Sequence, residues 1–306
     1  MKKYLFNLKF TLVLLFILAI RLSAQETIVK KGLVLDLNAN KEVVIEDSDR
    51  VASWRNQVKG NEVDIFVKQD SGRDKKIKKK VLGVGSGRPT LKKDVQVIGG
   101  NSTIVFKEQE LVNHQEDAFD HLVNGSGYTW FSVMCVYKQV KGKKDVNSFF
   151  GNLTNGKPYA GFWGNLTDDN RIWMGTRTGR DFGIKRKKGA SPLWHAELNP
   201  QVMAKKPLKE NKYYLVMGRM GAGKKTVELE LFVNSTDAVD RKKILIKGNA
   251  NPSKMTIGQE RDAINHPGFE SFHGEIARLL IYERPLTNEE LAKVVVELRE
   301  KYLIKE

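Results

Sequence analysis

The stretch PYAGFWGNLTDDNRIWMGTR, residues 158–177, predicts two β-strands joined by a polar turn at Asn165–Asn170. Side chains along a strand point alternately to opposite faces. If the small and apolar residues of the two strands lie opposite each other, they form one face, as expected for a side that packs on a core. The opposite face then carries the larger polar and aromatic residues, which are Tyr159, Trp163, Asn165, Arg171, Trp173 and Arg177.

This second face has the chemistry of a carbohydrate site. Flat aromatic rings stack on sugar faces, and the guanidinium fork of arginine matches a carboxylate or a sulfate. We therefore predict that Trp163, Trp173, Asn165 and Arg180 bind an acidic carbohydrate substrate. The competing interpretation is that both tryptophans pack in the core and the arginines are merely solvated.

The N-terminus has the pattern of a secretory signal. Lys2, Lys3 and Lys9 are followed by the apolar run Phe10–Ile20, and small residues precede a cleavage point after Ala24. This run is shorter than the roughly 20 residues that span a bilayer. We therefore expect residues 1–24 to be a signal peptide and residues 25–306 to form the mature protein, exported to the periplasm or secreted.

The single cysteine, Cys135, lies in an apolar strand pattern. One cysteine excludes an internal disulfide framework and a cysteine-based zinc site. A lipid anchor would need a cysteine at the cleavage point, and Gln25 stands there instead. The sequence therefore predicts no membrane anchor, and Cys135 is expected to be a small buried hydrophobic residue.

The formal net charge of +16 indicates a polyanionic partner. The predicted signal contributes four basic residues and no acids, so its removal leaves +12. No helix-turn-helix, zinc-finger, RRM or KH signature is present, and export also argues against nucleic acid. An acidic polysaccharide or oligosaccharide is therefore the expected partner. The alternative is that lysine-rich loops serve only solubility.

The order of the predicted elements indicates one all-β domain. Tyr128–Lys138 is the longest strand pattern and is apolar on both faces, as in a central strand. Thr287 and Glu290 form a capping box. Apolar residues then recur at helical spacing from Leu291 to Tyr302. We expect a two-sheet antiparallel β-sandwich, a jelly roll, with one C-terminal α-helix.

The C-terminal segment carries a family resemblance. Phe272–Ala277 (FHGEIA) is followed by Ile281-Tyr282, Pro285-Leu286-Thr287 and the predicted helix. This ending resembles the laminin-G-like branch of the concanavalin A-like lectin/glucanase superfamily, as do four segments before it: Leu33–Asn38, Val51–Trp54, Arg88–Leu91 and Ile104–Phe106. The resemblance implies a jelly roll with ligands on the concave sheet or its rim. It does not fix the activity, because the fold hosts lectins, hydrolases and polysaccharide lyases.

Two other chemistries have weaker support in the sequence. Retaining hydrolysis needs a close pair of carboxyl groups. The glucanases of this superfamily carry them in an E-x-D-x-E strand, and the nearest match here is Glu228-Leu229-Glu230. We interpret this pair of glutamates as a solvated face. Asp168, Asp169 and Asn170 could offer oxygen atoms to calcium. The same three residues are ordinary turn formers, and no cofactor is otherwise expected.

Elimination next to a uronate carboxylate fits the composition best. The reaction requires a cation or amide to neutralise the carboxylate, together with a base and an acid. Arg171, Arg177 and Asn165 are the candidates for neutralisation. Tyr159 and His195 are the candidates for proton transfer. Jelly-roll lyases of acidic polysaccharides use such residues on a concave sheet, but their R-x-E and Q-I-H strand motifs are absent here.

The sequence thus favours an exported carbon–oxygen lyase. Its substrate would be a uronate polysaccharide or its oligosaccharides, sulfated and of algal type such as ulvan, and its action lyase cleavage or sugar dehydration. A non-catalytic lectin for acidic glycans is the alternative, and a glycoside hydrolase comes third. His266 and His273 are reserve candidates for the base, whereas His114 and His121 are expected to be structural or exposed.

Overall fold

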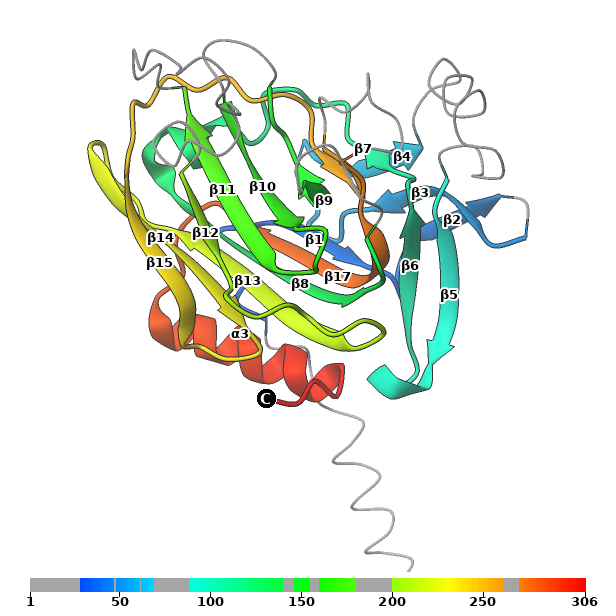
Figure 1. Cartoon of the computed structure of the whole chain (residues 1–306). Helices are drawn as coiled ribbons and strands as arrows, with labels where there is room; N and C mark the ends of the chain where they lie inside the picture. The colour runs from blue at the N-terminus through cyan, green and yellow to red at the C-terminus, as the bar shows by residue number, and fades with distance from the viewer. Residues whose placement is uncertain are drawn as a thin grey trace, which may run out of the picture.

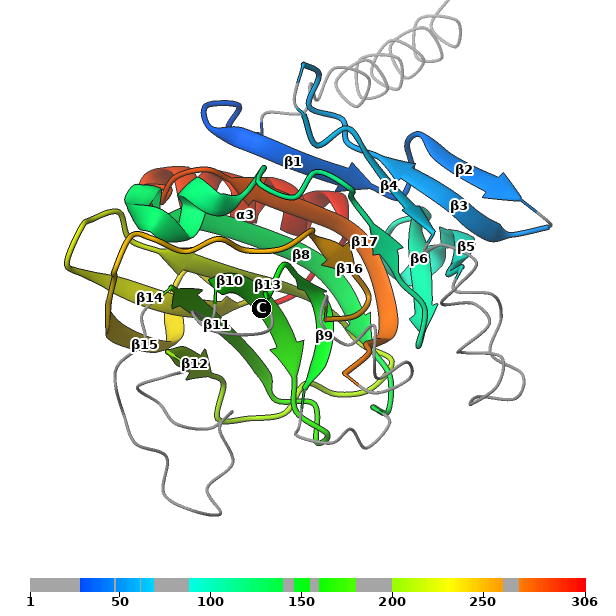
Figure 2. The same ribbon diagram turned by 90° about the horizontal axis from the view of Figure 1, so that it is seen from above.

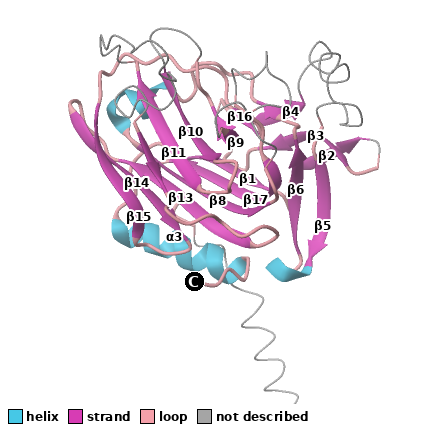
Figure 3. Cartoon of the chain, viewed as in Figure 1, coloured by secondary structure: helices cyan, strands magenta, loops and turns pink. Residues whose placement is uncertain are grey.

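The computed structural model describes residues 28–46, 48–60, 62–68, 88–139, 146–154, 160–179, 200–260 and 270–306. Antiparallel β-strands dominate this part of the chain, with one α-helix, α3 (Asn288–Lys301), near the C-terminus (Figure 3). Two short helical segments, η1 (Gln96–Ile98) and η2 (Leu122–Ser126), connect strands. The predicted all-β sandwich with a C-terminal helix is confirmed. No helix in these ranges is long and apolar enough to cross a membrane.

One layer of the sandwich, which we call the back sheet, has the hydrogen-bonded order β15–β14–β13–β8–β17 (Figure 1). Strands β1 and β6 pair with successive halves of β17, and β5 pairs with β6. The strands of this sheet are β1 (Leu33–Asn38), β5 (Thr90–Val95), β6 (Asn101–Lys107), β8 (Tyr128–Val136), β13 (Tyr213–Met220), β14 (Thr226–Val233), β15 (Ala238–Leu245) and β17 (His273–Tyr282).

The other layer, the front sheet, has the order β12–β11–β10–β9–β16–β7–β4–β3–β2. The two sheets join at one edge, where Arg50 of β3 lies opposite Thr90 of β5 (Figure 2). The strands of this sheet are β2 (Val43–Glu46), β3 (Arg50–Arg55), β4 (Ile65–Lys68), β7 (Leu111–Val112), β9 (Asn147–Gly151), β10 (Ala160–Leu166), β11 (Ile172–Thr178), β12 (Gln201–Met203) and β16 (Thr256–Ile257).

Strand β8 is the central strand that the sequence predicts, with β13 on one side and β17 on the other. All its residues are buried. Trp130 and Met134 face the core between the two sheets. Phe131 and Cys135 belong to a second cluster, which includes the apolar side of α3. The alternation of β8 therefore supplies both hydrophobic layers, and Cys135 is buried as expected.

Helix α3 covers the outer side of the back sheet, opposite the front sheet (Figure 2). It begins with the predicted capping box: Thr287 N donates to Glu290 Oε2 at 3.0 Å, and Glu290 N donates to Thr287 Oγ1 at 3.2 Å. The Glu290 carboxylate also accepts from Arg284 at 2.7 Å. These interactions fix where the helix starts and how it leaves β17.

From residue 160 onward the predicted hairpin is observed as β10 and β11, with residues of the same face opposite each other as predicted. Trp163 lies opposite Gly175, and Asn165 opposite Trp173. The inner side chains join the core between the sheets; they are Ala160, Phe162, Leu166, Ile172 and Met174. The turn is shorter than predicted, since Asn165 belongs to β10 and Thr167 N bonds to Arg171 O at 3.0 Å.

A buried ion pair fixes the edge of the back sheet. Arg278 of β17 donates to both carboxylate oxygens of Asp36 of β1, from Nε at 2.9 Å and from Nη2 at 2.8 Å. The two residues are 1% and 4% exposed. A bidentate ion pair has a defined geometry, so it helps to set the register between β1 and β17.

Candidate functional site

The predicted site residues that the structure describes lie mainly on the outward side of the front sheet. Directly opposed residues on neighbouring strands share a face, so the register brings together residues from β9, β10, β11 and β12. We call this surface the front face and define it by Ser148, Trp163, Asn165, Trp173, Arg177, Gln201 and Met203.

Trp163 occupies the centre of the front face because its two neighbours are glycines. Gly151 of β9 and Gly175 of β11 lie opposite it on either side. A Cβ atom at Gly175 would lie 2.4 Å from Trp163 Cζ2, which is a collision. The indole therefore lies across the backbone of β11, in space that any other residue at position 175 would occupy.

A cation and a second indole pack against Trp163. The Trp173 ring meets it edge to face, with ring centroids 6.1 Å apart and an interplanar angle of 84°. The guanidinium carbon of Arg177 lies 5.4 Å from the centroid of the Trp163 ring. This distance is within the range of cation–π attraction. The front face thus holds a permanent positive charge against an aromatic frame.

Asn165 orients the central indole. In the amide orientation that satisfies its neighbours, its nitrogen donates to Ser148 Oγ and its oxygen accepts from Trp163 Nε1 at 3.1 Å. Asn165 is fully buried. In this structure it positions Trp163, and its predicted contact with a substrate stays a prediction.

The front-face aromatics are well buried. Trp163 is 2% and Trp173 3% exposed, and Arg177 is 7% exposed. The indoles form a small cluster with Val146 and Leu153, separate from the core between the sheets. The rings pack on each other and on these aliphatic residues, so neither is a flat open platform here. Their role in stacking on a sugar stays a prediction.

Arg171 lies at the turn beyond the front face. Its Nε donates to both oxygens of Asp169 at 3.1 Å. A hydrogen bond from Thr167, together with Arg171, lowers the pKa of the Asp169 carboxyl. Asp168 accepts from Asn147 at 3.1 Å. These carboxylates organise the turn, and within the described ranges no cluster of three or more His, Cys, Asp or Glu could hold a metal ion.

Several predicted residues lie outside the described residues. They are Tyr159, Arg180 and His195, with the reserve candidate His266 and the predicted signal peptide 1–24. Tyr159 directly precedes β10 in the sequence, and Arg180 is the second residue after the end of β11. The predicted proton-transfer pair of Tyr159 and His195 therefore has no described geometry.

The carboxylate pair considered for hydrolysis lies elsewhere. Glu228 and Glu230 belong to β14 of the back sheet. Glu230 is only 6% exposed and accepts from Arg219 Nε at 2.6 Å, so the interpretation of this pair as a solvated face is wrong for Glu230. Arg219 also donates to Leu286 O and Asn288 Oδ1. This network ties β13 and β14 to the start of α3.

Another buried carboxylate has a structural role. Glu275 of β17 is 1% exposed. It accepts hydrogen bonds from Lys92 at 2.8 Å, from Thr103 at 2.6 Å, and from the hydroxyls of Tyr137 and Tyr213. Burial alone would raise its pKa, but these donors outweigh burial and lower it. With four donors already bound, Glu275 joins the strands around it and has little capacity left for a ligand.

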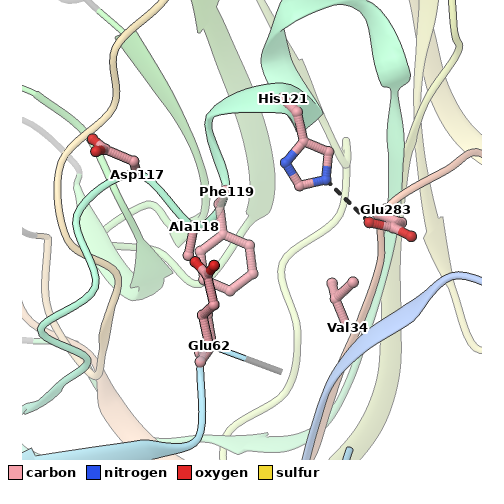
Figure 4. Close-up of a pocket in the computed structure, with 8 residues that line it drawn as sticks. Val34, Glu62, Asp117, Ala118, Phe119, His121 and Glu283 are labelled. Carbon is pink, nitrogen blue, oxygen red and sulfur yellow. Dashed lines mark hydrogen bonds and ion pairs between the residues drawn. The ribbon is translucent and has the colours of Figure 1, made fainter. Parts of the chain in front are cut away.

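A pocket of about 310 Å³ lies away from the front face, beside β1 and the loop that precedes η2 (Figure 4). Val34, Val63, Ala118 and Phe119 contribute apolar surface, and the polar lining residues are Glu62, Asp117, His121 and Glu283. His121 Nε2 lies 3.2 Å from Glu283 Oε2. His121 is exposed, as the sequence predicts.

The pocket is acidic, although the chain is basic. Burial, followed by repulsion from Asp117 and Glu116, raises the pKa of the neighbouring Asp120 carboxyl to about 6. Such a shift is the response of a carboxyl group to burial first and to nearby negative charge second. An anionic ligand would be repelled from this pocket, so it is a poor candidate for the predicted acidic glycan.

Sequence reasoning missed two features of these sites. Gln201 and Met203 of the front face lie on β12, which has only three residues and therefore too little alternation to detect. The pocket is formed by loops that lie against β1. Periodic sequence patterns predict helices and strands, and they do not predict which loops come together. The arrangement of glycines opposite Trp163 was the available signal for the front face, since Gly151 and Gly175 stand in the printed sequence.

Comparisons with known proteins found weak structural similarity. No protein-family model matches the chain, and no curated protein matches it. A structure titled "NanB plus Optactamide" is 15% identical with a TM-score of 0.43, and the match covers 64% of this chain and 27% of that one. The CBM40 of a Ruminococcus gnavus IT-sialidase, bound to α2,3-sialyllactose, is 14% identical with a TM-score of 0.39, covering 56% and 82%.

The binding domain of botulinum neurotoxin serotype D/C is 10% identical with a TM-score of 0.46, and the match covers 87% of this chain and 52% of that one. This chain therefore spans about a quarter of the NanB structure and about half of the toxin structure. The identities and TM-scores are too low to carry a functional assignment.

Proposed function

We propose that this protein binds an acidic glycan and that the front face is its binding site. One observation carries the proposal: the Arg177 guanidinium lies 5.4 Å from the centre of the Trp163 ring, in a frame completed by Trp173. An arginine held against an aromatic ring keeps its planar fork in one orientation, which suits a carboxylate or a sulfate. The proposal requires the ligand to reach Trp163 and Trp173, which are 2% and 3% exposed in the structure, so that their rings contact the apolar face of the sugar.

The charge of the whole chain supports an anionic ligand. The formal net charge is +16, and a positive field raises the local concentration of polyanions and their rate of association. The front face contributes a cation at an apolar site, where its interaction with an anion is stronger than in water. The acidic pocket lined by Glu62 and Glu283 has the opposite character.

Family, domain and location are part of the same proposal. The C-terminal motifs that carry the family resemblance form β17 and the capped helix α3 in the structure. This supports membership of the laminin-G-like branch of the concanavalin A-like superfamily. We assign residues 25–306 to one jelly-roll domain and residues 1–24 to a signal peptide. The protein would then meet its glycan in the periplasm or outside the cell.

β-Elimination on a uronate is the second candidate function. It is favoured by Arg177, because a guanidinium on the ligand face can neutralise the carboxylate whose α-proton is removed. Tyr159 and His195 remain the proposed acid and base, acting on a polyuronate, sulfated and algal such as ulvan, or on its oligosaccharides. Elimination leaves a double bond conjugated to the carboxylate, so ultraviolet absorbance of the mixture tests it. No rise in absorbance with any bound polyuronate would leave the protein a lectin.

Electrophoresis through gels that contain polysaccharide tests binding. The panel is polygalacturonate, alginate, ulvan and dextran sulfate, with neutral dextran as the blank. The wild-type protein should be retarded by at least one acidic polymer and not by dextran. Retardation should weaken as salt is added, because salt screens exposed charges.

Arg177→Leu should weaken binding about tenfold to a hundredfold, as expected for loss of a hydrogen bond to a charged group. The affinity of Arg177→Lys should lie between that of the wild type and that of Arg177→Leu, since lysine keeps the charge but lacks the planar guanidinium fork. Arg55→Leu is the matched control, because Arg55 is exposed on β3 and pairs with Asp64. Equal retardation of Arg177→Leu and Arg55→Leu would refute the proposed site.

A further inference from the structure

Gln201 of β12 is the least explained polar residue of the front face. It lies opposite Gly175, which in turn lies opposite Trp163, so three strands place these residues in one row on one side of the sheet. Gly175 has no side chain, and the Trp163 indole reaches over it: a Cβ at Gly175 would lie 2.4 Å from Trp163 Cζ2 and 3.1 Å from Pro200 O. The indole therefore extends toward the strand that carries Gln201.

The carboxamide oxygen of Gln201 is buried, and in the described structure it accepts no hydrogen bond. A buried acceptor without a donor is costly, and native proteins seldom keep one without a reason. Other buried acceptors on the front face are used, as Asn165 shows by accepting from Trp163 Nε1. An O–H group of a ligand that reaches this oxygen would satisfy it.

We infer that Gln201 is a specificity-determining residue that accepts a hydrogen bond from a sugar hydroxyl close to the anionic group held by Arg177. The inference rests on the function proposed above and narrows its ligand. Arg177 is two residues along β11 from Gly175, the partner of Gln201, so the anion and the hydroxyl must be near each other on one residue of the glycan. A uronate with a free ring hydroxyl meets this requirement. A polymer with its hydroxyls blocked keeps the carboxylate but loses the donor.

The test uses polygalacturonate and alginate, each native and after O-acetylation, with the full mature protein. The wild-type protein should bind the native polymer about fivefold more tightly than the acetylated one, the gain expected from one neutral hydrogen bond. Gln201→Leu should bind both forms equally, at the level of the acetylated polymer. Arg177→Leu should weaken binding of both forms. Gln96→Leu is the matched control, since Gln96 is exposed on η1.

Thermal unfolding gives a second readout that needs no glycan. Replacing an unsatisfied buried acceptor by an apolar group of similar size should leave the Tm of Gln201→Leu equal to or above that of the wild type. A Tm well below that of wild type would show that Gln201 is satisfied within the protein and would overturn the inference alone.

The outcomes separate the two proposals. If Gln201→Leu still prefers the native polymer, the inference fails and the proposed function stands. If wild type binds neither polymer but is retarded by dextran sulfate, Gln201 does not read a uronate hydroxyl, and the site is one for sulfate. If no acidic polymer is bound, the proposed function fails and the inference fails with it.

Discussion

At the scale of single residues, the front face depends on what is missing at position 175. Gly175 leaves room for the Trp163 indole, which then lies within reach of Arg177 and Trp173. Trp163, the central side chain of the front face, is thus positioned by Gly175, which has no side chain. Because protein interiors are close-packed, the space beside Trp163 does not accommodate an added methyl group at position 175.

Gly175→Ala should therefore destabilise the protein by about 1–3 kcal/mol, the usual cost of forcing extra volume into a packed site. The cause would be displacement of Trp163, so the tryptophan fluorescence of the folded variant should change as well. Urea unfolding measures the free energy. Gly221→Ala is the control, since a Cβ at Gly221 would have its nearest neighbour at 3.4 Å. Equal stability of the two variants, with unchanged fluorescence, would contradict this account of Trp163.

At the scale of elements, two contacts hold the ends of the chain to the sandwich. One is the buried pair between Asp36 of β1 and Arg278 of β17. The other is the cap of α3, where Glu290 bonds to both Arg284 and the Thr287 backbone. The cap was predictable from sequence because its residues are three apart. The ion pair was not, because Asp36 and Arg278 are separated by almost the whole described chain.

Asp36→Asn should cost about 3–5 kcal/mol in unfolding free energy, since removing one partner leaves the other charge buried and uncompensated. Urea unfolding again provides the measurement. The double variant Asp36→Leu with Arg278→Met should recover much of the loss, because it leaves no buried charge. A single variant as stable as wild type would show that the pair does not hold β1.

The cap predicts a pH dependence. Hydrogen bonding by Arg284, followed by that of the Thr287 backbone, lowers the pKa of Glu290 from its usual value of 4.5 to about 2. Because the folded pKa is depressed, this stabilisation is complete above pH 4.5 and is lost as the pH falls toward 2. In this window the stability of wild type should fall more steeply than that of Glu290→Gln. Glu289→Gln, next to the cap, should follow wild type. Parallel slopes for wild type and Glu290→Gln would exclude this role of Glu290.

At the scale of the whole molecule, local patterns predicted the sandwich better than they predicted the site. Alternation predicted which residues of the hairpin share a face, and the apolar character of both faces predicted the central position of β8, because both are local patterns in the sequence. The same pattern could not show that Trp163 and Trp173 would pack edge to face and be buried, since that depends on Leu153 and Val146 from another segment. Nor could it show that Glu230 is buried against Arg219, because the two lie on different strands.

The position of a bound glycan tests the central claim most directly. The measurement is a crystal structure of the mature protein with an acidic oligosaccharide taken from the polymer that retards it most. The account predicts the sugar on the front face, with its anionic group on the Arg177 guanidinium and its ring against Trp163 or Trp173. A glycan seated instead in the pocket of His121 and Glu283, or elsewhere with the front face unoccupied, would contradict it.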